Sequence, residues 1–282
     1  MILDKKIQYI YNQLAFVCQD LLHNSPSANK TREYINSRLS KAIQKKYEFG
    51  FFPTQQNLYE LTSKISEKDL EYIKVYFPTR KENLPNYSKE NEDDPETIEC
   101  IYDAQGHYCN HNLVMPFRDE HGHMVAFLGR TLLSDDERSD LGVQKYKYNS
   151  GCSKNLFLYG LNIKAKNSII EKNYVICVEG QFDCIALQTA GVKNCVAIGT
   201  THLSHYQLFL IHRYTNNIIL MLDNDEAGNR AKVKIKKRFG HIANIKTIGI
   251  PGKYKDIDEY LKKEEDLWYK GYFLNKINNL EL

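Results

Sequence analysis

The chain has 282 residues, of which 42% are hydrophobic and 26% charged, and its formal net charge is +3. This length allows two packed units, and no apolar run approaches the roughly 20 residues that a membrane-crossing helix needs. These features predict a soluble protein with no membrane partner and exclude a disordered tail. The net charge alone is too small to indicate nucleic-acid binding.

The opening residues, "MILDKKIQYI", show no signal peptide. The seven cysteines are scattered along the chain, and none pairs with another cysteine or a histidine at the spacing of a zinc site. An odd, scattered set is also poor material for a disulfide framework. We therefore expect a protein of the reducing cytoplasm that binds no zinc.

Residues 4–73 are predicted to be mainly helical. Their apolar residues recur at helical spacing, as in "IQYIYNQLAFVCQDLL". Residues 79–99 are instead polar, charged and interrupted by proline, which predicts an exposed insertion.

Residues 110–133 contain two short runs that are typical of β-strands, "NLVMPF" and "MVAFLGRTLL". They are joined by "RDEHGH", in which Gly122 suits a tight turn. The segment therefore predicts a β-hairpin.

The last third of the chain alternates between strand-like and helical patterns. Its apolar runs lie in "YVICVEG", "NCVAIGT", "NIILMLDND" and "IKTIGIPG", with amphipathic helical segments between them. Near-continuous apolar strands separated by such helices predict a parallel sheet that is covered on both faces. The expected class is α/β, with a mixed α+β first half before a parallel-sheet domain.

Acidic residues follow these apolar runs. Glu179 ends the first run, Asp223 and Asp225 end the third, and an acidic segment at 252–258 follows the fourth. Ligands of parallel sheets bind beyond the carboxyl ends of the strands, so we expect these acids to converge. Crowded carboxylates repel one another, and a divalent cation with oxygen ligands, Mg²⁺ above all, relieves that repulsion.

A purely structural interpretation of the third run stays open. Asp225 can cap the helix that begins near Ala227, where an acid also complements the helix dipole. Glu179 at a second strand end and the acids of "KDIDEYL" argue for a shared metal site instead.

At these residues the sequence resembles the Toprim domain of bacterial DnaG-type DNA primases, with "VEGQFD", "IGTTHLS", "MLDNDEAG" and "GKYKDIDEYL" in order. Upstream, "LVMPFRDEHGHMVAFLGRTL" resembles the basic hairpin of the primase core, and "KYKYNS" and "KNLFLYGL" resemble the segments that follow it. "TREYINSRLSKAIQKKYEFGFFP" resembles the helical entry to that core. The resemblance covers residues 14–261.

The resemblance also implies which residues form the site. It makes three residues the central catalytic acids: Glu179, Asp223 and Asp225. It assigns further metal-linked positions to Asp183, Asp256 and Asp258. It assigns contacts with nucleotide or DNA phosphates to Arg118, Arg130, Lys145, Asn149 and Lys154. Asn224 stands where the family commonly has glycine, a replacement we attribute to the ability of asparagine to adopt left-handed backbone conformations.

The function that the resemblance implies is that of a DNA primase core from a phage or mobile element. Such a core binds single-stranded DNA and ribonucleoside triphosphates and joins the nucleotides with Mg²⁺ or Mn²⁺. Because no zinc module is visible, a replicative helicase or a single-strand-binding protein is the expected partner. The expected divisions are a helical and basic part at 1–165, a Toprim domain at 166–262 and a helical tail at 263–282.

Two other functions fit the same residues. Toprim acids are shared with topoisomerases and some nucleases, so a strand-cleaving enzyme is the first alternative. A degenerate, primase-like accessory protein of replication is the second, although the intact acids argue against decay.

Overall fold

The computed structural model describes residues 4–78 and 105–280, and the chain divides into two compact units. The first unit is drawn from residues 1–117 and 124–152, and the second from residues 118–123 and 153–282. The insertion predicted at 79–99 lies outside the described residues. The domain boundaries predicted after residues 165 and 262 stay a prediction.

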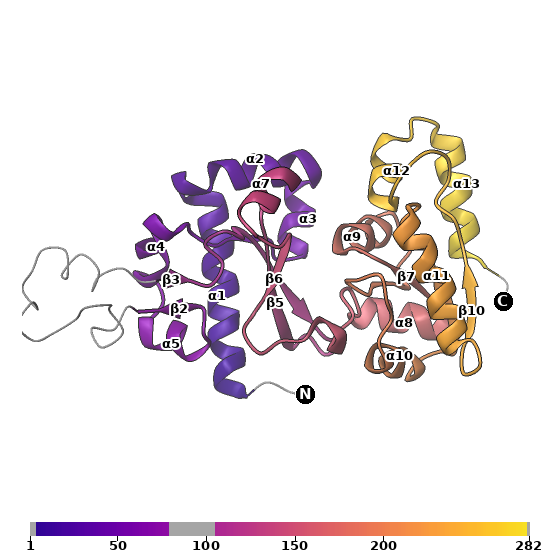
Figure 1. The fold of residues 1–282 in the computed structure, drawn as a ribbon, viewed down its shortest axis with the longest axis horizontal. Coiled ribbons are helices and arrows are strands. Elements are labelled where there is room, and N and C mark those ends of the chain that lie inside the picture. Colours follow the sequence, from indigo (N-terminus) through magenta and orange to yellow (C-terminus); the bar gives the residue numbers. More distant parts are fainter. Residues whose placement is uncertain (1–3, 79–104, 281–282) are drawn as a thin grey trace, which may run out of the picture. The chain divides into compact units, whose positions relative to one another are not determined.

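The first unit combines helices with a four-stranded sheet of order β1-β4-β5-β6, of which Figure 1 labels β5 and β6. Its helices are α1 (Lys5–Asn24), η1 (Pro26–Ala28), α2 (Asn29–Arg38), α3 (Lys41–Lys46), η2 (Gln55–Asn57), α4 (Tyr59–Thr62), α5 (Glu67–Tyr72) and α7 (Asp135–Asp140). The sheet contains β1 (Gly50–Phe51), β4 (Leu113–Arg118), β5 (Met124–Arg130) and β6 (Tyr146–Tyr148), and a separate antiparallel pair contains β2 (Tyr76–Phe77) and β3 (Gln105–Gly106).

Helix α1 forms because its apolar residues share one face. Ile10, Leu14 and Cys18 are buried at helical spacing, and the helix packs against β1 and β5. Asp4 caps its first turn, since its Oδ1 accepts a hydrogen bond from the main-chain N of Lys6 at 2.6 Å. None of the described helices is long and apolar enough to cross a membrane.

The predicted hairpin is confirmed as β4 and β5. Gly122 has a φ of 82° in the turn, a left-handed conformation that favours glycine. Asp119 stabilises the same turn, because its Oδ1 accepts hydrogen bonds from the main-chain N atoms of His121 and His123, each at 2.9 Å.

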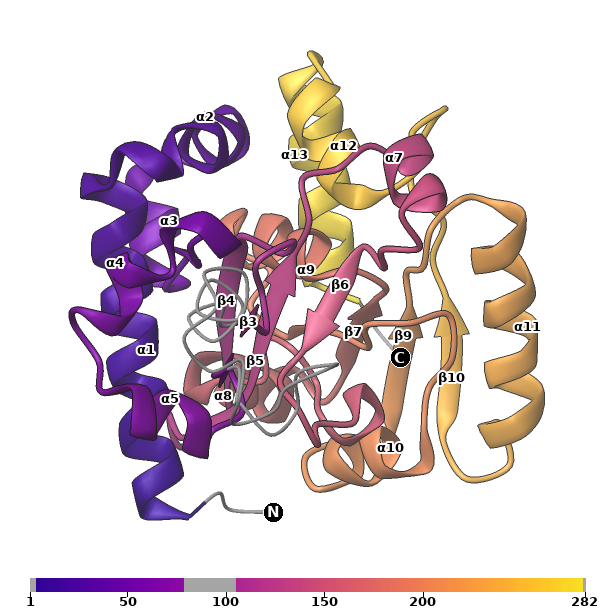
Figure 2. The same ribbon diagram turned by 60° about the vertical axis from the view of Figure 1, so that its left-hand side comes forward.

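The second unit is built around a parallel sheet of order β10-β9-β7-β8, of which Figure 2 labels β7, β9 and β10. Its strands are β7 (Val175–Val178), β8 (Cys195–Ala197), β9 (Asn217–Leu220) and β10 (Asn244–Thr247). Its helices are η5 (Lys154–Leu156), α8 (Ile163–Lys172), α9 (Gln181–Thr189), α10 (His205–His212), α11 (Glu226–Phe239), α12 (Ile257–Lys263) and α13 (Leu267–Asn278). The expected α/β class is confirmed.

Helices cover both faces of this sheet. On one face, Cys177 and Leu220 join a buried cluster with Leu208 of α10 and Ile235 of α11. Figures 1 and 2 both show α11 alongside β10. On the other side, α9 packs against β8 and α12. With both faces covered, ligands can reach the sheet only at its ends.

The hairpin turn is fastened to α10 through a buried carboxylate. Glu120 is 6% exposed, and its Oε1 accepts a hydrogen bond from the Tyr214 hydroxyl at 2.7 Å and lies 2.9 Å from Arg213 Nη1. Burial alone would raise the pKa of Glu120, but the hydrogen bond from Tyr214 and the charge of Arg213 outweigh it and lower that pKa.

Replacing Glu120 by glutamine should therefore destabilise the fold in a pH-dependent way. The folded pKa is lowered, so the stabilisation is present above about pH 4.3, the ordinary value, and is lost as the pH falls through the folded pKa. At neutral pH we expect Glu120→Gln to reduce the unfolding free energy by about 1–3 kcal/mol. Urea denaturation at several pH values measures this, with the exposed Glu265→Gln as control. An equal loss at pH 7 and pH 3 would contradict a charge effect.

Candidate active site

The central acids predicted from the sequence follow the parallel strands. Glu179 comes directly after β7, and its main-chain oxygen accepts a hydrogen bond from Gly199 N, beyond the end of β8, at 2.9 Å. Asp223 and Asp225 lie between β9 and α11 and are half-buried. Because β7 and β9 pair in parallel, these acids share the carboxyl edge of the sheet.

Asp183 is the buried member of the acidic set. It is 7% exposed in the first turn of α9, where its Oδ2 accepts a hydrogen bond from Gly180 N at 3.1 Å. Its Oδ1 accepts another from Asp258 N, at the start of α12, at 3.2 Å. This bond brings the predicted acids of α9 and α12 together.

The negative charge at this edge exceeds what the surrounding groups balance. Burial first, and then the charges of Asp256 and Asp223, raise the pKa of Asp183 to about 8. Asp258, which is 3% exposed, forms an ion pair with Lys262 at 2.6 Å. Asp183 accepts hydrogen bonds from the main-chain N atoms of Gly180 and Asp258, but burial outweighs them, so its ionised form is disfavoured.

Two of the acids also cap helices. Asp225 Oδ1 accepts a hydrogen bond from Gly228 N at 2.8 Å, and Asp256 Oδ1 accepts one from Glu259 N at 2.7 Å. Asp225 therefore caps α11, as the structural interpretation of the sequence predicted. The Gly228 bond and the charge of Lys255 lower the pKa of Asp225, which keeps this carboxylate ionised.

Gly228 allows α11 to begin close to the main chain of Asp223. A Cβ atom at this position would lie 2.2 Å from the main-chain oxygen of Asp223, closer than any side chain can approach. Glycine is therefore required for this close packing of the helix on the strand end.

The reason that the sequence analysis gave for Asn224, a left-handed backbone conformation, was wrong. Asn224 is not among the described non-glycine residues with positive φ. Its side chain instead donates from Nδ2 to the main-chain oxygens of Ile250 at 2.9 Å and Tyr254 at 3.1 Å. The carboxamide of Asn224 therefore fastens the loop after β10 to the segment that carries Asp223 and Asp225.

Two lysines that the sequence analysis did not select flank the acidic pair. Lys255 Nζ lies 3.6 Å from Asp225 Oδ2. Lys232 Nζ donates to the main-chain oxygen of Asp223 at 3.3 Å and to Asn229 Oδ1 at 3.2 Å. The basic run of α11 was a visible signal for Lys232, but nothing in the local pattern distinguished Lys255 from other surface lysines.

The donor set fits a hard divalent cation of the Mg²⁺ type. Carboxylate oxygens are its preferred protein ligands, and the raised pKa of Asp183 indicates negative charge that a cation would relieve. Within residues 4–78 and 105–280, no three His, Cys, Asp or Glu side chains lie close enough to hold a metal ion on their own. The arrangement therefore suits an ion that takes one or two carboxylates and completes its coordination with water and phosphate oxygens.

Two predicted basic residues belong to the second unit. Lys154 begins η5, which is tied to α10 because Gln207 Nε2 donates to Phe157 O at 2.8 Å and Ser204 Oγ donates to Asn155 O at 2.6 Å. Gln207 also donates to Ile198 O, just beyond β8, at 2.9 Å, so η5 lies near the carboxyl edge of the sheet. Arg118 ends β4, and its Nη1 donates to Gly122 O at 3.1 Å.

The other three predicted phosphate-binding residues belong to the first unit. The guanidinium of Arg130 lies 5.1 Å from the ring centre of Tyr34 and 5.6 Å from that of Tyr146. Lys145 is exposed. Asn149 is 7% exposed, and its Oδ1 accepts a hydrogen bond from Phe127 N at 2.8 Å. This hydrogen bond joins Asn149 to β5 and supports the sheet. Phosphate binding by these residues stays a prediction.

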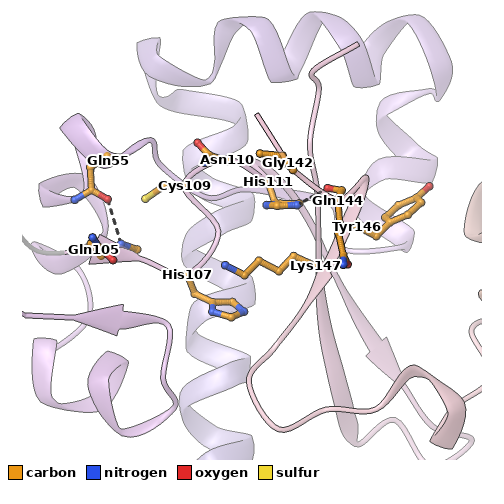
Figure 3. A pocket seen from close by; sticks show the side chains of 12 residues that line it. Gln55, Gln105, His107, Cys109, Asn110, His111, Gly142, Gln144, Tyr146 and Lys147 are labelled. Atoms are coloured by element: carbon orange, nitrogen blue, oxygen red, sulfur yellow. Dashed lines mark hydrogen bonds between the residues drawn. The ribbon is translucent and has the colours of Figure 1, made fainter. Parts of the chain in front are cut away.

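A polar cavity of about 750 Å³ lies beside β6 in the first unit (Figure 3). Lys147 extends into it, with His107 and His111 in its wall. Each imidazole lies with Nε2 2.8 Å from a main-chain oxygen, and burial lowers the pKa of both, which favours their neutral forms. No carboxylate is among the described residues that line the cavity, and Lys147 forms no ion pair with any described acid. The sequence analysis missed Lys147, because a lysine in a strand-like run is usually solvated.

A family profile described as Toprim-like matches residues 176–261, which run from within β7 into α12. The DNA primase of Aquifex aeolicus is 26% identical over 267 residues, which cover 92% of this chain and 47% of that protein. The DNA primase of Thermotoga maritima is 34% identical over 153 residues, 54% of this chain and 26% of that protein. The chain thus spans between about a quarter and about half of these curated relatives.

Solved primase structures share the fold. The Aquifex aeolicus primase structure with zinc-binding and RNA polymerase domains has a TM-score of 0.69 at 24% identity, over 96% of this chain and 61% of that one. The RNA polymerase domain of Mycobacterium tuberculosis primase has a TM-score of 0.71 at 21% identity, over 94% and 82% of the two chains. A DnaG primase catalytic domain that was solved bound to single-stranded DNA has a TM-score of 0.67 at 22% identity, over 96% and 78%.

The raised pKa of Asp183 predicts a stability gain on neutralisation. Folding favours the protonated acid, so between about pH 4, the ordinary value, and pH 8 the stability of the metal-free protein should fall as the pH rises. Asp183→Asn should remove this slope and become increasingly more stable than the natural chain up to about pH 8. Thermal denaturation in EDTA at a series of pH values measures it. The exposed Asp136→Asn is the control, and a slope that survives in Asp183→Asn would contradict the assignment.

Proposed function

This chain is a relative of the DnaG-type DNA primases, and we propose that it is the catalytic core of such an enzyme. It would synthesise short RNA primers on single-stranded DNA from ribonucleoside triphosphates. The observation that carries the proposal is the set of carboxylates at the carboxyl edge of the parallel sheet, where burial first, and then the charges of Asp256 and Asp223, raise the pKa of Asp183 to about 8. Sequence similarity to primases across 92% of the chain supports the same reaction over other Toprim chemistries.

The reaction is nucleotidyl transfer. A primer 3′ oxygen forms a bond to the α-phosphorus of the incoming nucleotide, the bond from that phosphorus to the pyrophosphate oxygen breaks, and the 3′ hydroxyl proton passes to a base. Asp223 and Asp225 would hold a divalent cation, and Asp183, Asp256 and Asp258 are proposed as further metal-linked positions. Mg²⁺ or Mn²⁺, when bound, neutralises and orients the phosphates. Glu179 would position the metal or accept the proton.

Basic side chains of the chain supply the remaining positive charge. Arg118 offers a forked guanidinium, which suits phosphate oxygens, and Lys154 offers a compact ammonium near the end of β8. In the first unit, Arg130 and Lys145 would contact the template or primer backbone. Lys147 joins them in the proposal, because a half-buried ammonium without a described carboxylate partner is best compensated by a phosphate.

The proposed setting is DNA replication in a bacterial or phage-infected cell. Contacts to phosphates position a strand without reading its sequence. The core by itself is therefore expected to prime with weak sequence selectivity, and a replicative helicase or single-strand-binding protein would supply the stimulation. A phage or mobile element is the proposed origin.

Asp223→Asn should abolish primer synthesis without unfolding the protein. The amide loses the negative charge that would hold the cation, so we expect a fall of more than about 100-fold in nucleotide joining. The assay uses labelled ribonucleotides, single-stranded DNA and Mg²⁺ or Mn²⁺, resolved on a denaturing gel. Asp136→Asn is the matched control. Cleavage of the DNA with no extension product, in the natural chain, would favour the strand-cleaving alternative instead.

Lys147→Met should weaken binding of single-stranded DNA and flatten its salt dependence. Each lost phosphate contact on a single strand removes about 0.7 from the slope of log K against log salt. Fluorescence anisotropy with a labelled oligonucleotide at several salt concentrations measures the slope. Lys68→Met, an exposed lysine of α5, is the control. A slope equal to that of the natural chain would remove Lys147 from the binding surface.

A further inference from the structure

Asn224 ties two acidic segments of the chain together. Its main-chain N donates to Lys255 O at 2.8 Å, and its side chain donates to Ile250 O and Tyr254 O at 2.9 and 3.1 Å. A glycine at this position would keep only the main-chain bond. The carboxamide therefore adds two bonds that hold the loop after β10 against the segment that carries Asp223 and Asp225.

This loop delivers Lys255 to the acidic pair. The main chain of Lys255 is bonded on both sides, since its N donates to Glu259 Oε2 at 2.9 Å and its O accepts from Asn224. Its Nζ lies 3.6 Å from Asp225 Oδ2, while 62% of the side chain remains exposed. The backbone of Lys255 is thus fixed, but its ammonium is free to move away.

An exposed ion pair of this kind contributes little to folding stability. Its effect on the acidic edge is larger, because the ammonium lies next to a carboxylate oxygen that a metal ion would use. Two cations that compete for one carboxylate repel each other and exclude each other sterically. Lys232 is less able to compete, because its described hydrogen bonds go to the Asp223 main chain and to Asn229.

We propose that Lys255 is a built-in counter-ion of the acidic edge, held in place by Asn224, which a divalent cation displaces when it binds. The inference rests on the proposed function, since it takes the acidic edge to be the metal site. Lys255 is a positioning residue here: it balances Asp225 in the metal-free protein and keeps metal affinity low. Once displaced, its ammonium is available to an incoming phosphate, so metal and triphosphate binding reinforce each other.

The test is Mn²⁺ binding to the full chain, without nucleotide, measured by calorimetry and by the electron paramagnetic resonance signal of free Mn²⁺. Lys255→Met should bind Mn²⁺ about three- to tenfold more tightly than the natural chain, because the competing charge is gone. Lys255→Arg should bind like the natural chain, because it keeps the charge. Asn224→Gly should shift the affinity in the same direction as Lys255→Met, because the loop is released. Lys253→Met, which removes an exposed lysine two residues away, should leave the affinity unchanged.

The outcomes separate this inference from the proposed function. If Lys255→Met and Lys253→Met bind Mn²⁺ equally, the counter-ion role is overturned while the metal site stands. If Asp223→Asn binds Mn²⁺ as tightly as the natural chain, the acidic edge is not the metal site, and the proposed function fails with it. If Lys255→Arg tightens binding as much as Lys255→Met, the effect does not depend on the positive charge, and the counter-ion argument is wrong.

Discussion

Repulsion among carboxylates at one edge of a parallel sheet is the constraint on which the second unit depends. Parallel pairing of β7 with β8 and β9 brings the carboxyl ends of the strands together, and Asp223 and Asp183 gather there. Such a concentration of charge persists in a fold only if fixed donors oppose it. The structure supplies main-chain N–H groups at helix starts and lysines at the rim. That compensation is incomplete, and a bound cation would supply the missing positive charge.

Helix capping makes the site geometry inseparable from the fold. Asp225 and Asp256 each satisfy the first turn of a helix while presenting a carboxylate at the acidic edge. The position of each carboxylate is therefore set by α11 and α12, two regular elements, and not by a loose loop. The same bond that stabilises a helix start also holds the acid ionised, as the lowered pKa of Asp225 shows. A carboxylate that caps a helix through one oxygen can still offer its other oxygen to a metal ion, so the capping role of Asp225 does not argue against the proposed metal site.

The fold class and the acidic edge could be predicted because both follow from short-range rules. Apolar runs predict strands, and the carboxyl-end rule places Glu179 and Asp223 at one edge wherever the strands pair in parallel. The partners of those acids could not be predicted in this way. Lys255 reaches Asp225 only because Asn224 bonds to a loop about thirty residues further along the chain, and local pattern carries no information about that contact. Likewise, the burial of Asn149 and the cavity around Lys147 depend on how β5, β6 and residues 105–111 pack, which periodicity does not specify.

The two units face opposite electrostatic problems. At the edge of the second unit, buried and half-buried carboxylates exceed the nearby cations, which favours a bound cation. In the cavity of the first unit, a half-buried ammonium lies among neutral imidazoles and amides with no carboxylate in the described lining, which favours a bound anion. The proposed nucleotide-joining reaction would need both kinds of site, because a metal ion is attracted to acids while the nucleic-acid backbone is repelled by them. An acidic strand edge in the second unit and an uncompensated lysine in the cavity of the first would meet that requirement, since neither charge then has to be tolerated where the other is needed.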